Sequence, residues 1–248
     1  MDYPGKMPAM IIDTDVGYDD LLAILYLLAE GSIDIEAFTV VNGISTVPDG
    51  ANALLWVQEQ LGLANPIPVY RGESKQPNSF PDDWRNQACK LGWTHPVKLK
   101  PQPQPAVEFL KQRLSKSEPA QLLMIGPQTN IAGALTGMPL IAPFTATVMG
   151  GAFYVPGNLP QSDPVAEANI YVDPPAASTF FNYISNSLSS VSVVPLDACN
   201  RVPVTAEFIQ TFSRLSVPTS KAGYWKLAKS PHPDIERVRV PAASRLRL

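Results

Sequence analysis

Four aspartates lie within eight residues near the start of the chain, between an apolar run at residues 9–12 and a longer one at 21–28. They are Asp13, Asp15, Asp19 and Asp20. Like charges this close raise one another's pKa and oppose folding unless another group compensates them. A hard divalent cation is the obvious compensator, because Ca²⁺ and Mg²⁺ prefer carboxylate oxygens. We therefore interpret this acidic loop, residues 13–20, as a metal site between a strand and a helix.

Two other interpretations of the acidic loop are open at this stage. Asp19 could cap the helix while Asp13 or Asp15 pairs with a distant arginine, although four carboxylates exceed what capping requires. A phosphatase loop of the haloacid dehalogenase type also places two aspartates after a strand. That loop has a threonine soon after its second aspartate, where this chain has Val16-Gly-Tyr18. The metal site is therefore the favoured interpretation.

Apolar segments typical of buried strands alternate along the chain with segments of helical periodicity. The predicted strands are 8–14, 35–41, 67–70, 121–125, 144–149 and 191–195. The predicted helices are 19–30, 48–61, 106–114, 131–137, 174–184 and 205–215. This alternation predicts a single α/β domain, residues 1–248, with a mostly parallel open sheet flanked by helices on both faces.

Residues 71–103 interrupt the alternation. They are polar, rich in proline, asparagine and tryptophan, and show no convincing periodicity. The whole chain has 26 prolines in 248 residues, about twice the usual share of ~5%. We interpret 71–103 as a long loop excursion, and loops of that length are usually functional or mobile.

Composition excludes several classes of function. The net charge of −3 and the pI near 5.4 give no basic surface for nucleic acid. No apolar run approaches the roughly 18 residues that span a bilayer, and the first residues lack the pattern of a signal peptide. The two cysteines, Cys89 and Cys199, match no metal or redox spacing. We expect a cytoplasmic protein with no nucleic-acid or membrane partner.

Four polar clusters each follow a predicted strand. They are the acidic loop, Asn42-Gly43, residues 128–130 and residues 149–169. In open α/β sheets, ligands bind at the carboxyl ends of the strands. We therefore expect these clusters to meet at one edge of the sheet and to form the ligand site there.

The last cluster contains Glu167 and Asn169, an acceptor and an amide two residues apart. In an extended segment both side chains would point the same way, which suits the hydroxyls of a sugar. A solvated loop is the alternative for this segment taken alone. Gly150-Gly151, followed by Gly157-Asn158, could bring backbone close to a ligand. These glycines match neither of the common phosphate-binding patterns.

The acidic loop resembles the N-terminal signature of the inosine–uridine-preferring nucleoside hydrolase family, and further segments match the family in the same order over roughly residues 8–205. The central Gly-Pro-Leu-Thr-Asn turn of the family is similar to Gly126-Pro-Gln-Thr-Asn130 here. The other matching segments are Val148–Ala152, Gly157-Asn158, Ala166–Pro174 and Val194–Asp197. An ordered set of this kind is improbable by chance.

The resemblance implies hydrolysis of the N-glycosidic bond of a purine or pyrimidine ribonucleoside, giving ribose and free base. It implies a bound Ca²⁺ held by Asp15, Asp20 and the backbone carbonyl of Thr129. Asp15 would also be the general base that activates the attacking water, and Asp13 would support the loop. The residues implied to contact ribose are Asp19, Met149, Asn158, Glu167 and Asn169. The implied partner is a small-molecule nucleoside, and the implied assembly is a homo-oligomer.

The chain departs from the family pattern at two places. The family often has Gly-Asn after its second strand, whereas this chain has Asn42-Gly43, so Asn42 becomes the candidate for ribose binding. The family also supplies a late His-Asp pair, whose aspartate completes the calcium shell and whose histidine, in some members, protonates the base. Here His232 and Asp234 are interpreted as loop residues, and His95 as a surface histidine rather than part of the base pocket.

The departure late in the chain leaves two alternatives. The chain is either a shortened member of the family or one whose C-terminal reading frame has diverged. The alternative function is therefore an inactive or weakly active relative that binds metal and ribosides without turnover.

Overall fold

Six parallel strands form a single sheet in the computed structural model, which describes residues 9–89, 96–139, 143–159, 162, 165–202 and 205. The strands are β1 Met10–Thr14, β2 Ile35–Val40, β3 Val69–Arg71, β4 Ala120–Met124, β5 Phe144–Met149 and β6 Ser190–Val194. Their order is β3-β2-β1-β4-β5-β6, and every neighbouring pair is parallel. The predicted α/β fold with a parallel sheet is confirmed.

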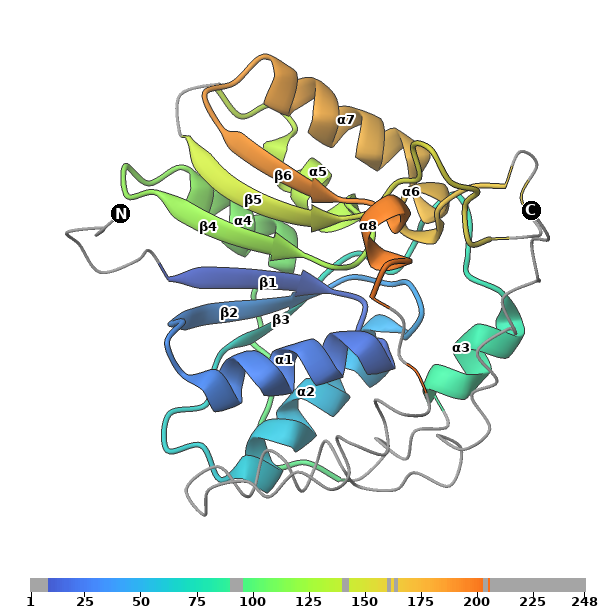
Figure 1. Ribbon diagram of the computed structural model, residues 1–248. Coiled ribbons are helices and arrows are strands. Elements are labelled where there is room, and N and C mark those ends of the chain that lie inside the picture. The colour runs from blue at the N-terminus through green and yellow to red at the C-terminus, as the bar shows by residue number, and fades with distance from the viewer. Residues whose placement is uncertain are drawn as a thin grey trace.

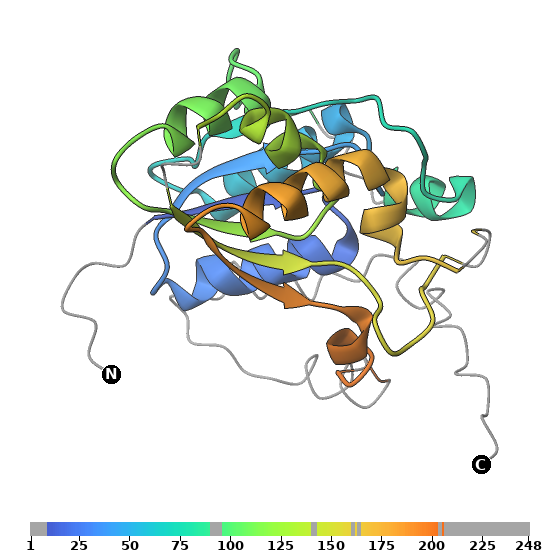
Figure 2. The ribbon, with the colours of Figure 1, turned by 90° about the horizontal axis from the view of Figure 1, so that it is seen from above.

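Helices cover both faces of the sheet (Figures 1 and 2). One face packs against α1 Tyr18–Glu30 and α2 Val47–Leu61, and the other against α4 Ala106–Leu114, α5 Thr129–Leu135 and α7 Pro174–Ser185. Neighbouring residues of β1 serve the two layers, since Ile12 joins the core with α1 and α2 while Ile11 joins the core with α4, α5 and α7. This sandwiching explains why the central strand β1 is buried along its whole length, including Asp13 and Thr14.

Three short helices lie beyond the carboxyl ends of the strands, where the arrowheads point in Figure 1. They are α3 Asp82–Cys89, α6 Ala168–Val172 and α8 Leu196–Cys199. The prediction that 71–103 is a loop throughout is wrong at α3, whose mostly polar sequence carries no apolar stripe to reveal a helix. The predicted helix 205–215 falls almost wholly outside the described residues.

Both α1 and α2 end where the sequence predicts, after residues 30 and 61. α1 ends at Gly31 and α2 at Gly62, both in the left-handed conformation with φ of 73° and 60°. Only one side of α1 is buried, although its sequence is apolar nearly all round. Leu21, Ile24 and Leu25 are buried, whereas Tyr26 on the opposite side is 58% exposed. Within the described residues, no helix combines the length and apolar character needed to cross a membrane.

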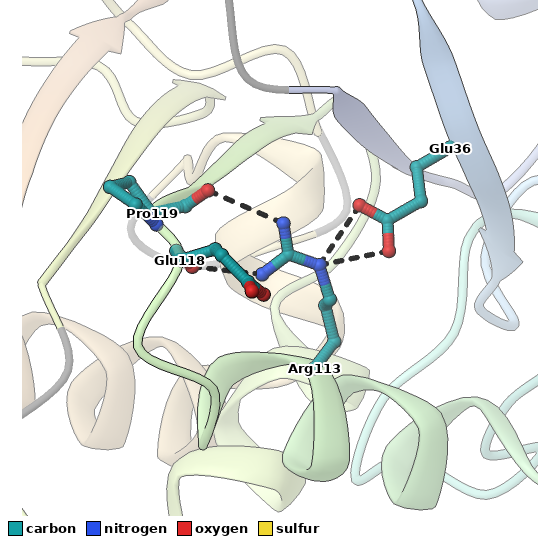
Figure 3. A network of polar contacts seen from close by, with 4 residues as sticks. All are labelled: Glu36, Arg113, Glu118 and Pro119. Carbon is teal, nitrogen blue, oxygen red and sulfur yellow. Dashed lines mark hydrogen bonds and ion pairs between the residues drawn. The ribbon is translucent and has the colours of Figure 1, made fainter.

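An ion pair joins α4 to the start of β2, away from the carboxyl ends of the strands (Figure 3). The Nε of Arg113 lies 2.8 and 2.9 Å from the two carboxylate oxygens of Glu36. Its other nitrogens donate to the backbone carbonyls of Glu118 at 3.0 Å and Pro119 at 3.3 Å. Because Arg113 is buried with its donors engaged, the pair holds α4 and the segment before β4 to the edge of β2.

Candidate active site

The strand order reverses direction between β1 and β4. The chain winds from β1 outward to β3, then returns to β4 and winds the opposite way to β6. The loops that leave β1 and β4 therefore diverge, and the carboxyl ends of these two strands are where open α/β sheets form their ligand crevice. The acidic loop leaves β1, and the turn that begins at Gly126 leaves β4, so both predicted clusters reach this crevice.

Asp15 and Asp20 are both buried, and they lie close enough for the charge of Asp15 to raise the pKa of Asp20. The Oδ2 of Asp15 accepts a 2.7 Å bond from the amide of Ile44. The Oδ2 of Asp20 accepts bonds from the hydroxyl of Thr14 at 2.8 Å and the amide of Gly17 at 3.1 Å. Thr14 ends β1, while Gly17 and Ile44 lie in the loops that follow β1 and β2, so both carboxylates are held where these two strands end.

Two glycines allow backbone to pass directly against Asp15. A Cβ on Gly43, after β2, would overlap the Asp15 carboxylate. A Cβ on Gly126, after β4, would lie 2.8 Å from the Asp15 amide nitrogen and 2.9 Å from a methyl of Val41. Neither glycine has a positive φ, so close approach, not backbone conformation, requires them.

Burial raises the pKa of both carboxyls. The pKa of Asp15 rises to about 6, mainly through burial and partly through the charge of Asp19. The pKa of Asp20 lies well above its ordinary value, because of burial and then the charges of Asp15 and Asp19. A cation between them would remove this penalty, since an adjacent positive charge favours the ionised form.

Asp13, at the end of β1, bonds to neighbouring elements rather than to the rest of the acidic loop. Its Oδ1 accepts bonds from the hydroxyl of Thr39 on β2 at 2.5 Å and from the amide of Asn130 on α5 at 2.9 Å. Its Oδ2 is buried with no hydrogen-bond partner, and burial raises its pKa to about 7. A carboxyl that stays protonated to neutral pH suits a structural role that joins β1, β2 and α5.

Val16, between the two buried acidic side chains, has a φ of 57°. This left-handed conformation is a genuine outlier for a β-branched residue and costs on the order of 1–3 kcal/mol. The Val16 amide donates to the hydroxyl of Thr14 at 2.9 Å. The Val16 carbonyl accepts from the hydroxyl of Ser45 at 2.9 Å. The surroundings thus hold the sharp turn that directs Asp15 and Asp20 to the same place.

The second half of the site lies at the end of β5. Glu167 accepts bonds of 3.0 Å from the amides of Gly151, Asn169 and Ile170, and so caps α6. The side-chain Nδ2 of Asn169 donates to the carbonyls of Ile125 and Met149 and to the Met149 sulfur, at 3.3–3.4 Å. The expected extended segment at 167–169 is wrong, because Glu167 begins a helix and Asn169 lies within it.

The remaining candidates have the following places. The Oδ1 of Asn158 accepts from the amide of Ala168 at 2.9 Å, which ties Asn158 to α6. Asp19 is exposed at the start of α1. Cys199 lies near both halves: burial raises the pKa of its thiol, and the charges of Glu167 and then Asp19 raise it further. Cys199 is thus within electrostatic reach of both Glu167 and Asp19.

Asn42 lines a separate part of the crevice edge. Its Nδ2 donates to Gln76 at 2.7 Å, and its Oδ1 accepts from Arg85 at 3.0 Å. Asn42, Gln76 and Arg85 are among the residues that line a cleft of about 840 Å³, formed mostly by residues 74–85. The excursion thus folds back against the end of β2, with Asn42 at the junction.

The donors in the crevice suit a hard cation. Among the described residues, no three His, Cys, Asp or Glu side chains form a group able to hold a metal. Asp15 and Asp20 supply two adjacent buried carboxylates, and α5 begins at Thr129. Ca²⁺ accepts carboxylate and carbonyl oxygens together with water, so this donor set fits calcium, with other ligands drawn from water or substrate hydroxyls. His95, His232 and Asp234 lie outside the described residues.

Several residues of the site carried no role in the sequence interpretation. Thr39 could have been noticed as a polar residue within an otherwise apolar strand. Asp173, directly before Pro174, has the pattern of a helix cap, and it caps α7 by accepting from the amide of Ala176 at 3.1 Å. Gln76 and Arg85 carry no such signal, because only the fold brings residues 71–103 back to β2.

Comparison with known proteins agrees with this geometry. Residues 10–234 match the sequence pattern of the family described as inosine-uridine preferring nucleoside hydrolase. The chain belongs to this family. The matched range includes the acidic loop, the turn after β4 and the segment around α6.

Individual relatives are similar over most of the chain. A pyrimidine-specific ribonucleoside hydrolase RihA from Citrobacter koseri is 32% identical over 218 residues, which make up 85% of this chain and 67% of the relative. The structure of the plant nucleoside hydrolase PpNRh1 matches with a TM-score of 0.73 and 30% identity, covering 89% of this chain and 69% of that one. A purine-preferring ribonucleoside hydrolase from Gardnerella vaginalis matches with a TM-score of 0.72 and 26% identity, covering 89% and 71%. The chain thus spans about two thirds of the length of these relatives.

Proposed function

We propose that the chain hydrolyses the N-glycosidic bond of ribonucleosides to ribose and free base, in the crevice between the ends of β1 and β4. One observation carries this proposal: two buried carboxylates, Asp15 and Asp20, interact at the switch point of the sheet. Family membership supports it, as do the names of relatives, which are ribonucleoside hydrolases.

Asp15, Asp20 and the backbone carbonyl of Thr129 would hold Ca²⁺. When bound, the cation would lower the pKa of a water molecule and orient it. The Asp15 carboxylate, held by the Ile44 amide, would accept the proton of that water as general base. Since Gly43 and Gly126 close around Asp15, the carboxylate has little freedom to leave this position. Such restraint suits a group that must stay aligned through the reaction.

The second half of the crevice would bind the sugar. Asp19, Asn158, Glu167 and Asn169 offer carboxylate and amide groups for ribose hydroxyls, and Met149 supplies an apolar wall. Departure of the base leaves positive charge on the ribose ring, and a pocket rich in carboxylates stabilises that charge. Asn42 is a further ribose candidate, although its amide is engaged by Gln76 and Arg85 in this structure.

Ribose release is the test of this function. The protein is incubated with uridine and with inosine, because the relatives differ in the base that their names give, in the presence of Ca²⁺ and then of a chelator. Equal amounts of ribose and free base, produced only with Ca²⁺, are expected. Calcium binding without ribose would instead identify an inactive relative, and phosphate release from a nucleotide would indicate a phosphohydrolase.

A further inference from the structure

A short segment of the excursion, residues 73–78, bonds to three separate parts of the crevice rim; we call it the strap. Its first residue, Glu73, donates its amide to the Asn130 side chain at 3.1 Å. At its other end, the side chain of Asn78 donates to the carbonyl of Tyr171 at 2.7 Å. Asn130 also binds Asp13, and Tyr171 lies in α6 two residues after Asn169. The strap therefore touches both halves of the site.

Gln76 lies at the middle of the strap and uses its whole amide group. Its Nε2 donates to the backbone carbonyl of Asn42 at 2.5 Å and to the hydroxyl of Thr129 at 3.1 Å. Its Oε1 accepts from the Asn42 side chain at 2.7 Å. One side chain thus joins the end of β2 to the start of α5, across the two strands that flank the crevice.

The hydroxyl of Thr129 is fixed from two sides. It donates its only proton to the Oδ2 of Asp173 at 2.8 Å, so the bond from Gln76 occupies an acceptor position of the same oxygen. Asp173 is held in turn by the amide of Ala176 at the start of α7. The strap and the residue that caps α7 therefore hold the Thr129 hydroxyl together, in addition to the backbone bonds of α5.

We propose that Gln76 is a positioning residue for the reaction. Through the Thr129 hydroxyl it fixes the first turn of α5, and so the Thr129 carbonyl. Through Asn42 it fixes the end of β2, next to Gly43, which packs against Asp15. This role rests on the proposed function, since that function gives the Thr129 carbonyl its task as a calcium ligand. Gln76 acts through these residues and is not itself catalytic.

The test compares Gln76→Met with the matched control Gln112→Met, which alters an exposed residue of α4. Methionine keeps the length and neutrality of glutamine while it removes all three bonds of Gln76. In calcium-free protein, hydrogen exchange is followed at the amides of Asn42 and Ala132, which bond to the carbonyls of Glu73 and Gln128. Exchange at both amides should quicken about tenfold in Gln76→Met, the ratio that about 1.4 kcal/mol represents, and stay unchanged in Gln112→Met.

Calcium affinity gives a second measurement that merely structural damage elsewhere would not reproduce. Gln76→Met should raise the Kd for Ca²⁺ about tenfold in a calorimetric titration, whereas Gln112→Met should leave the Kd unchanged. If Gln76 acts in part through the Thr129 hydroxyl, the same change made in a Thr129→Val background should raise the Kd by a smaller factor, because that bond is already gone and only the bonds to Asn42 remain to be lost.

Two failures are distinguishable. Wild-type exchange and Kd values in Gln76→Met would overturn the positioning role, even if the wild-type protein releases ribose. Full additivity with Thr129→Val would overturn the path through the hydroxyl. A wild-type protein that releases no ribose would overturn the proposed function, while the exchange and Kd values would still decide whether Gln76 holds the rim.

Discussion

Gly126→Ala is the change that tests most sharply whether close approach at the switch point sets the position of Asp15. Gly126 follows β4, and its backbone passes against the end of β1. An added Cβ would lie 2.8 Å from the Asp15 amide nitrogen, 2.9 Å from a Val41 methyl and 3.2 Å from the Asp15 Oδ1. Ordinary contacts of a Cβ begin near 3.4 Å, so the two loops must separate by about 0.6 Å.

The separation should cost both stability and activity. The obstructing nitrogen belongs to backbone at the end of a central strand, which cannot rotate away as a side chain can. Overpacking of this kind typically costs about 1–3 kcal/mol of unfolding free energy. A misplacement of 1 Å at a reacting group can cost about a hundredfold in rate, so a shift of roughly half that size should lower kcat/KM about tenfold.

The measurement pairs ribose release with chemical unfolding, and Gly31→Ala serves as control. Gly31 ends α1 with a φ of 73° and has nothing within 4 Å of an added Cβ. Alanine there should cost about 1–2 kcal/mol through backbone conformation alone and leave kcat/KM unchanged. The reasoning would be refuted if Gly126→Ala matched Gly31→Ala, with comparable loss of stability and wild-type kcat/KM.

Three further changes test other parts of the structure. Arg113→Ala removes the partner of the half-buried Glu36 and should lower the unfolding free energy by about 1.5–3 kcal/mol in a urea titration, with ribose release intact below the melting temperature; a loss under 1 kcal/mol would show that the pair is dispensable. Removal of Ca²⁺ by a chelator should lower the Tm, because a ligand at 100 times its Kd contributes about 2.7 kcal/mol, and an unchanged Tm would argue against a bound cation. Glu167→Gln should raise KM several-fold. It should also lower the unfolding free energy by about 1 kcal/mol, because the NH₂ group of glutamine cannot accept the bonds that the backbone amides of Gly151 and Ile170 donate to the carboxylate. An unchanged KM would remove Glu167 from the sugar pocket.

Much of the fold follows from periodicity in the sequence. The mostly apolar runs that predict β1 and β2 reflect strands that are covered on both faces, whereas β5 alternates buried and exposed residues. The helices α1 and α2 end at residues 30 and 61, as the sequence predicts. α3, α6 and α8 are not predictable in this way. Each is short, and α3 is polar, so tertiary contacts rather than an apolar stripe decide their conformation.

The site also contains residues that the sequence reveals and residues that only the fold brings together. The carboxylates of the acidic loop stand out, because like charge between two apolar runs has few explanations in a folded chain. The position of Glu167 is harder to predict, since its caps to Gly151 and Ile170 replace the extended geometry that its sequence suggests. Gln76 could not be found from sequence, because its partners Asn42 and Thr129 lie 34 and 53 residues away and meet it only in the fold.

The central claim is that the Asp15 carboxylate at the switch point activates water for cleavage of a riboside. Its most direct test is the rate of ribose release by Asp15→Asn and by wild-type protein, at saturating Ca²⁺ and with both proteins shown to be folded. Removal of a general base typically costs 10²–10⁴-fold, so we expect a fall in kcat of at least about a hundredfold. A kcat for Asp15→Asn within a few-fold of the wild-type value would contradict the claim.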